Sequence, residues 1–194
     1  MPKNIIKWTL IAAVLLALAL PLTVSYLEDY TIGPDNSGLA DRVDQWMARG
    51  SRGTTDNQII LYDFIDVGWE RYVLADLNGR LAMLQLRKGI TGRYKLESYS
   101  AGSANFRQET VFYDPLFARD STFYFLFGGR NPDSRIASVR VVIDGVEYTV
   151  PVAPGEQFLS CIEIGAETSA ARPDPNLTVF FDAAGTDIAH LVER

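Results

Sequence analysis

Residues 71–89 read RYVLADLNGRLAMLQLRKG, and this stretch decides the class of fold. Two runs rich in apolar residues flank the pair Asn78-Gly79. An Asn-Gly pair between two such runs favours a tight β-hairpin, because a type I′ turn needs a positive φ angle at both central residues. We therefore predict two antiparallel strands joined at Asn78-Gly79.

The chain after residue 57 carries the same kind of pattern on both sides of this hairpin. A second hairpin is predicted within residues 136–155, with its turn at Asp144-Gly145. Further β-like runs are separated by turn residues and lie at 58–68, 92–101, 107–115, 121–131, 156–165 and the start of 177–194. About nine or ten short strands with such spacing predict a mainly β fold, either an antiparallel β-sandwich or a curled sheet.

One amphipathic helix is predicted in front of the strands. In SGLADRVDQWMARG, residues 37–50, the apolar residues fall at i, i+4, i+7 and i+8 on one helical face: Leu39, Val43, Trp46 and Met47. The segment 27–38 contains Gly-Pro and Asn-Ser-Gly, which are typical of turns, and is predicted to be a linker. We therefore expect the β-rich domain to occupy residues 39–194.

Residues 1–26 form a separate hydrophobic segment. Lys3 and Lys7 precede the run Trp8–Val24, which has no charged residue. Trp8 to Ser25 would make about 27 Å of helix at 1.5 Å per residue, close to the ~30 Å hydrocarbon core of a bilayer. The lysines favour a cytoplasmic N-terminus, and Tyr26 is a typical interfacial residue. We predict a signal anchor, a transmembrane helix that contacts the lipid bilayer through residues 5–25.

A cleaved signal peptide is the alternative interpretation of the same segment. Ala17 and Ala19 occupy the −3 and −1 positions of a small-residue cleavage site, and Pro21 just beyond them would end a helix. Both interpretations export the rest of the chain. The protein is expected to be single-pass in the cell membrane with its C-terminal domain outside, or secreted if the signal is removed.

Composition excludes several classes of function. The net charge is −6, and Lys3 and Lys7 lie outside the predicted domain, which makes that domain more acidic still. An acidic domain repels phosphate backbones, so we expect no nucleic-acid partner. Cys161 is the single cysteine and His190 the single histidine. An intramolecular disulfide is therefore impossible and a usual zinc site improbable, so we expect no metal and no cofactor.

One candidate ligand site follows the aromatic strand in FGGRNPDSR. The Gly128–Arg135 loop of this stretch carries three candidate ligand-binding residues, Arg130, Asn131 and Arg135. Two arginines near flexible glycines are suited to clamping a carboxylate or a phosphate. The alternative is an ordinary loop, because a strand followed by Gly-Gly and Asn-Pro mostly ends in a turn. A small-anion sensor that uses this loop stays open as a function.

Acidic residues offer two further hypotheses. An envelope hydrolase would need an Asp/Glu pair across a cleft, and the candidates are Asp63, Asp66, Glu70, Asp114 and Asp120. None of these is favoured over the others and no catalytic motif is present, so we predict that the chain is not an enzyme. Calcium needs only oxygen ligands, which two acidic loops carry. Their aspartates are better interpreted as turn and cap residues: Asp35, Asp182 and Asp187.

The aromatic run at 123–127 has two interpretations. Strand alternation puts Phe123, Phe125 and Phe127 on one face of the sheet and Tyr124 on the other. The phenylalanine face is either part of the core or an exposed patch that docks a partner.

Four stretches together resemble a known group of proteins: LADLNGRLAMLQLRKGITGRYKLES, FYFLFGGRN, VVIDGVEYTVPV and FFDAAGTDI. They are similar to the body of small membrane-anchored extracytoplasmic proteins of Gram-positive bacteria, in which an N-terminal anchor precedes a β-rich domain. The resemblance covers most of the chain from Gln58 and implies location and architecture alone. The predicted anchor, the acidic surface and the lack of a catalytic set favour a non-enzymatic binding module whose partner is an envelope protein or a glycan.

Overall fold

A computed structural model describes residues 3–49, 57–102, 105–113, 122–164 and 177–189, with side chains described outside 3–10, 12, 22 and 108–113. The elements in chain order are α1 Lys3–Asp29, α2 Leu39–Ala48, β1 Ile59–Val67, β2 Glu70–Leu77, β3 Arg80–Lys88, β4 Tyr94–Gly102, β5 Phe106–Tyr113, β6 Thr122–Arg130, η1 Pro132–Ser134, β7 Ser138–Ile143, β8 Val146–Pro151, β9 Gln157–Ile164 and β10 Val179–Phe181. The predicted mainly β fold with a short helix in front is confirmed.

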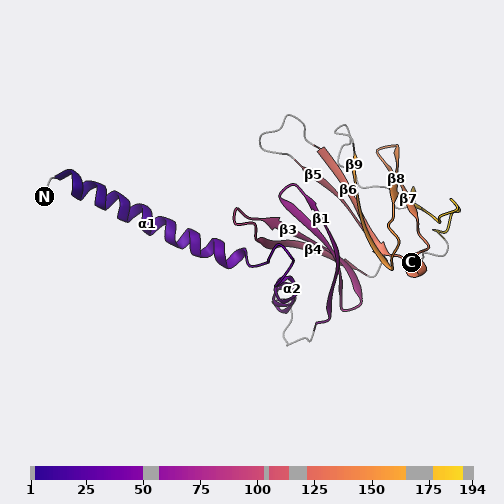
Figure 1. The fold of residues 1–194 in the computed structure, drawn as a ribbon, viewed down its shortest axis with the longest axis horizontal. Helices are drawn as coiled ribbons and strands as arrows, with labels where there is room; N and C mark the ends of the chain where they lie inside the picture. Colours follow the sequence, from indigo (N-terminus) through magenta and orange to yellow (C-terminus); the bar gives the residue numbers. More distant parts are fainter. Residues whose placement is uncertain (1–2, 50–56, 103–104, 114–121, 165–176, 190–194) are drawn as a thin grey trace.

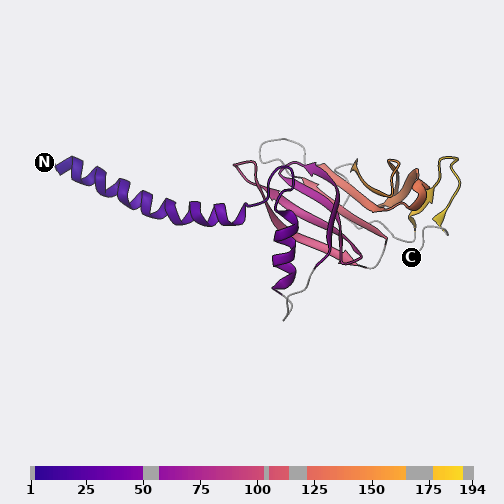
Figure 2. The same ribbon diagram turned by 60° about the horizontal axis from the view of Figure 1, so that its bottom comes forward.

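The described strands form three antiparallel sheets. The first sheet has the order β1-β2-β3-β4, the middle sheet β5-β6-β9 and the outer sheet β10-β7-β8. Figures 1 and 2 show the sheets in succession, with α2 against the first sheet and α1 projecting away from the domain. The strands therefore build a layered body from which one long helix extends.

Both predicted hairpins are present, and local sequence explains them. Asn78 and Gly79 have φ angles of 56° and 81°, and Leu77 pairs with Arg80 across the turn. Asp144 and Gly145 have φ angles of 50° and 80° between β7 and β8. Asn and Asp tolerate a positive φ angle better than other residues with a side chain, and Gly adopts it without strain.

Three hydrophobic clusters hold the layers together. Between α2 and the first sheet, Leu39 and Val43 pack against the buried strand side chains that face the helix, as the helical spacing predicted. Between the first and middle sheets, Leu74 and Met83 meet Leu126. Between the middle and outer sheets the cluster contains Phe125, Phe127, Val139, Val141, Ile143, Val150 and Phe158. The middle sheet is thus covered on both faces, which buries its central strand β6.

Strand β6 shows how close the layers come. A Cβ atom on Gly128 would lie 3.1 Å from Leu74 Cδ1 of the first sheet, and one on Gly129 would overlap the Phe106 ring. Gly128 and Gly129 lie inside β6 and are buried, so they are not the flexible loop glycines that the sequence suggested. Phe125 and Phe127 are also buried, so they belong to the core and form no exposed docking patch.

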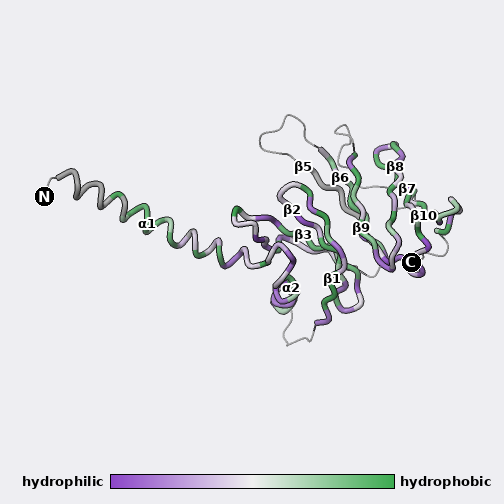
Figure 3. The backbone as a smooth tube through the Cα atoms, in the orientation of Figure 1, coloured by the Kyte–Doolittle hydropathy of each residue, from purple (hydrophilic) through white to green (hydrophobic). Residues whose placement is uncertain are grey.

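Helix α1 continues through Pro21 to Asp29, and the large apolar side chains described in it are uncovered. Figure 3 shows hydrophobic residues in the coloured part of α1, where it extends away from the domain. About half or more of each of these side chains is exposed: Ile11, Val14, Leu15, Leu16, Leu18, Leu20, Val24 and Leu27. Within the residues that the structure describes, no helix has both the length and the apolar character that membrane crossing requires.

Candidate functional site

An open pocket lies where α1 ends, between α2 and the edge strand β4. Its lining consists of Asp29, Arg42, Gln45, Trp46, Arg49, Lys95 and Leu96. Three cationic side chains face one carboxylate here, although the chain as a whole is acidic. An excess of positive charge beside an indole ring suits an anionic group, such as a carboxylate or a phosphate.

Helix α2 supplies one wall of this pocket. Arg42, Trp46 and Arg49 are spaced i, i+4 and i+7, so they share one face of the helix or of its C-terminal cap. Arg42 Nη2 donates to the Glu28 carbonyl oxygen at 3.5 Å, and Nη1 donates to Gln45 at 3.4 Å. The last turn of α1 has no basic residue of its own. Arg42 therefore places a cation at the negative end of α1, which ties α2 to that end.

Strand β4 supplies the opposite wall through Lys95. Lys95 Nζ forms an ion pair with Glu97 at 2.9 Å and lies 5.6 Å from the centre of the Tyr30 ring. The hydrogen bond to Glu97 raises the pKa of Lys95 above its usual value. The ammonium group therefore stays charged throughout the neutral pH range.

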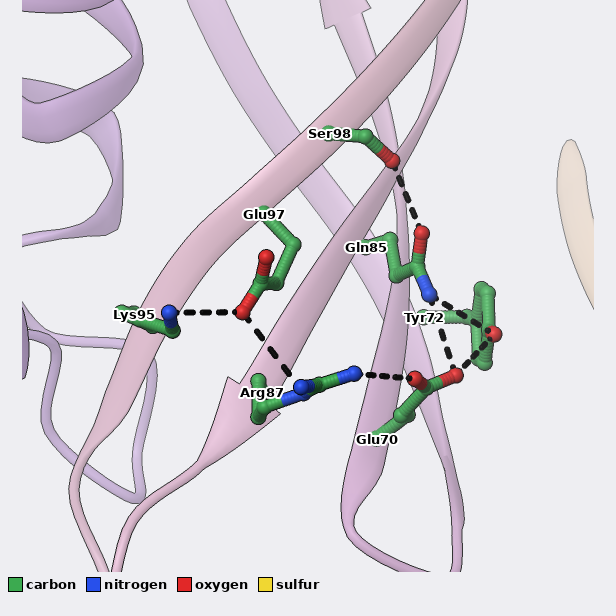
Figure 4. A network of polar contacts seen from close by, with 7 residues as sticks. All are labelled: Glu70, Tyr72, Gln85, Arg87, Lys95, Glu97 and Ser98. Carbon is green, nitrogen blue, oxygen red and sulfur yellow. Dashed lines mark hydrogen bonds and ion pairs between the residues drawn. The ribbon is translucent and has the colours of Figure 1, made fainter. Parts of the chain in front are cut away.

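A polar network continues from Lys95 across β4, β3 and β2 (Figure 4). Glu97 also lies 3.6 Å from Arg87, and Arg87 donates to Glu70 at 3.4 Å. Tyr72 Oη and Gln85 Nε2 both donate to Glu70 Oε2, at 2.5 and 3.0 Å. The two carboxylates face two cations, so charge is balanced inside the network, and the other two cations of the pocket are Arg42 on α2 and Arg49 at its C-terminal cap.

Arg71 fixes the segment between the two helices onto the first sheet. Its guanidinium donates to both oxygens of Asp66, at 2.6 and 2.9 Å, and to Pro34 O and Asn36 Oδ1, at 2.6 and 2.9 Å. The Phe64 and Tyr94 rings lie on it, 4.0 and 4.3 Å from Cζ. The hydrogen bond to Asp66 raises the pKa of Arg71 further, so this buried group stays charged.

The segment 27–38, which we predicted to be a linker, therefore contacts the domain at defined points. Its first residues complete α1, which ends at Asp29. Ile32 is fully buried and exchanges backbone hydrogen bonds with Tyr94 of β4, at 3.0 and 2.9 Å. Ile32 and Arg71 together hold the end of α1 next to the pocket.

The predicted anion-binding residues are each engaged elsewhere. Arg130 donates to Asp76 at 2.6 Å and to the Gly79 carbonyl at 2.9 Å, so it connects β6 to the first hairpin. Asn131 is fully buried and bonds both backbone groups of Ile136, at 3.0 and 2.8 Å. Arg135 forms an exposed ion pair with Asp133 at 2.9 Å. The structure does not bring the two guanidinium groups onto a shared partner.

The candidate carboxylates of the proposed hydrolase have hydrogen-bond or ion-pair partners where the structure describes them. Asp66 is held by Arg71, Glu70 belongs to the polar network, and Asp63 accepts from the Phe64 N–H at 2.8 Å. Asp114 and Asp120 lie outside the described residues. Whether two carboxylates face each other across a cleft stays a prediction.

The aspartates considered for calcium form turns. Asp35 accepts from the Ser37 N–H at 3.0 Å, and hydrogen bonds from the Ser37 side chain and backbone lower the Asp35 pKa. Asp182 accepts from two backbone N–H groups and Asp187 from one. Among the described residues, no group of three or more metal-ligating side chains comes together.

No protein-family model, curated protein or solved structure matches this chain. Function is therefore inferred from the geometry of the chain itself. Sequence reasoning missed the pocket, because Lys95 is far from α2 in the chain. The i, i+4, i+7 spacing of Arg42, Trp46 and Arg49 was the one available signal, and it could not show which strand would face these residues.

Proposed function

We propose that this chain is a membrane-tethered binding module, with α1 as the anchor and the β domain on the outer side of the cell membrane. The observation that carries the proposal is the exposure of α1. Its uncovered residues include Val14, Leu15, Leu16 and Leu18, which point to different sides of the helix. A helix that is apolar on all sides is stable when lipid or protein surrounds it, and no described part of this domain covers it.

The sequence around α1 supports this orientation. Lys3 and Lys7 precede the apolar run, and the domain beyond Asp29 is acidic. Positive residues flanking the cytoplasmic end of a span favour export of the other end. The uncharged run begins at Trp8, and the structure does not describe the side chains of residues 3–10. That α1 crosses the membrane is therefore part of the proposal. The resemblance to anchored proteins of Gram-positive bacteria agrees with it.

We further propose that the ligand is an anionic group of an envelope protein or glycan, held in the pocket without chemical conversion. Arg42 and Arg49 provide guanidinium forks and Lys95 a point charge, around the Trp46 indole. A carboxylate or phosphate would gain charge-assisted hydrogen bonds there. The pocket lies at the end of α1, so a ligand would be bound close to the membrane.

The anchor is tested by expressing the full chain in a bacterial host, extracting the membranes with alkaline carbonate and measuring the intact mass. We expect a full-length product that resists extraction. Leu16→Arg combined with Leu18→Arg should release it, since a central arginine costs about 2.5–3.5 kcal/mol on the insertion scale. Val146→Arg, at an exposed site in the domain, is the matched control. A shortened product in the medium would show a secreted domain and refute the tether.

The pocket is tested by thermal unfolding of the full chain in detergent micelles with increasing inorganic phosphate. Saturation at about 100 times Kd stabilises a protein by about 2.7 kcal/mol, or roughly 5–10 °C for a domain of this size. Arg49→Glu should abolish the shift, and Arg135→Glu, at an exposed arginine far from the pocket lining, should retain it. Loss of the shift only in Arg135→Glu would instead favour the Gly128–Arg135 loop as the anion site.

A further inference from the structure

The turn between β3 and β4 presents a large apolar side chain to solvent. Ile90 is 88 % exposed, the highest value among the exposed large hydrophobic residues of the described chain. The turn around it is well ordered by hydrogen bonds, from Gly89 N–H to Arg93 O at 2.7 Å and from Gly92 N–H to Gly89 O at 3.0 Å. The exposure of Ile90 therefore belongs to a defined turn that holds its side chain outward.

A second exposed apolar residue lies beside this turn. Trp69, in the turn between β1 and β2, is 58 % exposed. Its carbonyl oxygen accepts from the Lys88 N–H at 2.7 Å, which joins the two turns at the same end of the first sheet. Ile90 and Trp69 thus share one edge of the domain, which we call the apolar edge.

The apolar edge lies at the level of the last turns of α1. A Cβ atom on Gly89 would overlap the Tyr26 hydroxyl and lie 2.6 Å from a Tyr30 ring carbon, so the turn touches both tyrosines. The rings of Tyr26 and Tyr30 stack with centroids 4.3 Å apart. Tyr26 lies two residues after the end of the apolar run at Val24. It lies three positions before the last residue of α1, Asp29, which corresponds to about 4.5 Å of helix. Figure 1 shows this end of β3 and β4 pointing toward α1.

Two positive charges flank Ile90 at the apolar edge. Lys88 and Arg93 flank Ile90 in the turn, and both are exposed. Apolar and aromatic side chains flanked by Lys and Arg are suited to the interface of a bilayer, where cations meet lipid phosphates. In an otherwise acidic domain, this edge is complementary to an anionic lipid surface.

We propose that the apolar edge is a second membrane contact. Ile90 and Trp69 insert into the interfacial layer of the bilayer that α1 crosses, while Lys88 and Arg93 contact lipid phosphates. This inference rests on the proposed tether, because the end of α1 sets the depth of the turn. The contact holds the first sheet against the membrane and fixes the domain's tilt, so the pocket of Arg42 and Lys95 faces the layer just above the headgroups.

The test places a fluorescent label at defined positions of the full chain. Cys161→Ser removes the native thiol, and Ile90→Cys carries an environment-sensitive NBD group. The chain is reconstituted into vesicles of phosphatidylglycerol and phosphatidylethanolamine. Trp69→Cys is a second probe, and Val146→Cys, at the exposed first residue of β8, is the matched control. Quenching by nitroxide lipids and by aqueous iodide is compared, and vesicle flotation shows whether the chain is anchored.

We expect the labels at 90 and 69 to be quenched by nitroxide lipids and protected from iodide, with the reverse at 146. Transfer of an isoleucine-sized side chain out of water favours the membrane roughly ten- to a hundredfold, so the contrast should be large. Equal iodide quenching at 90 and 146 in chains that float with the vesicles would overturn the apolar edge and leave the tether intact. Failure of the chain to float would overturn the tether, and this inference with it.

Discussion

Arg71→Met is predicted to destabilise the domain because it removes the connection between the first sheet and the segment before α2. Methionine keeps an unbranched stem between the Phe64 and Tyr94 rings, so the change acts mainly on charge and hydrogen bonding. Four hydrogen bonds are lost, two to Asp66 and one each to Pro34 and Asn36. The variant therefore isolates the polar clamp from the packing around it.

The magnitude follows from opposing contributions. A hydrogen bond to a charged group contributes about 1.5–3 kcal/mol net, and stacking of a cation on an aromatic face adds about 0.5–2 kcal/mol. Removing a buried guanidinium recovers several kcal/mol of desolvation. Asp66 is 45 % exposed and can be hydrated once Arg71 is gone. We expect a net loss of about 2–4 kcal/mol, or roughly 5–15 °C in Tm.

The assay is urea denaturation of the full chain in detergent micelles, followed by near-ultraviolet circular dichroism. Arg135→Met is the control, because it breaks an exposed ion pair and should change the free energy of unfolding by no more than about 0.5 kcal/mol. Asp66→Asn leaves Arg71 without its counter-charge and should also destabilise. A loss for Arg71→Met no larger than that of the control would refute the role assigned to the clamp.

The remaining predictions concern buried groups of the middle sheet and the turn after it. Burial raises the pKa of the Cys161 thiol to about 11, so at pH 8 its thiolate is roughly a hundred times rarer than that of an ordinary thiol. Ellman's reagent should react slowly until urea is added, and rapid reaction in the native state would contradict this. Gly129→Ala forces a methyl group against Phe106 and should cost about 1–3 kcal/mol, seen as a lower Tm. Asn131→Ala removes two buried hydrogen bonds to Ile136 and should cost about 2–3 kcal/mol in urea denaturation, so an unchanged midpoint would argue against their contribution.

The elements themselves were predictable because their signals are local. Asn78-Gly79 and Asp144-Gly145 specify their turns through the φ angles of two adjacent residues. The spacing of Leu39 and Val43 placed one face of α2 against the strands, and both side chains are fully buried. Alternation correctly assigned Phe125 and Phe127 to one face of β6.

The candidate sites were not predictable to the same degree, since they depend on which elements meet. Gly128 and Gly129 read as a flexible loop, but both lie inside β6, where the neighbouring layers leave little room for a Cβ atom and so require glycine. Arg130 pairs with Asp76, which is 54 positions away in the chain, so no local pattern could show this partner.

By itself, the sequence determined the antiparallel β class, the two hairpins, the amphipathic helix and a separate apolar segment at the N-terminus, because φ preferences and hydrophobic periodicity act within a few residues. Only the tertiary structure decided the order of the three sheets, the clamp of Arg71 on the segment before α2, and the meeting of Lys95 with α2. It also placed Gly89 against Tyr26, although 63 positions separate them. Such contacts follow from the packing of whole faces against one another, which no short stretch of sequence encodes.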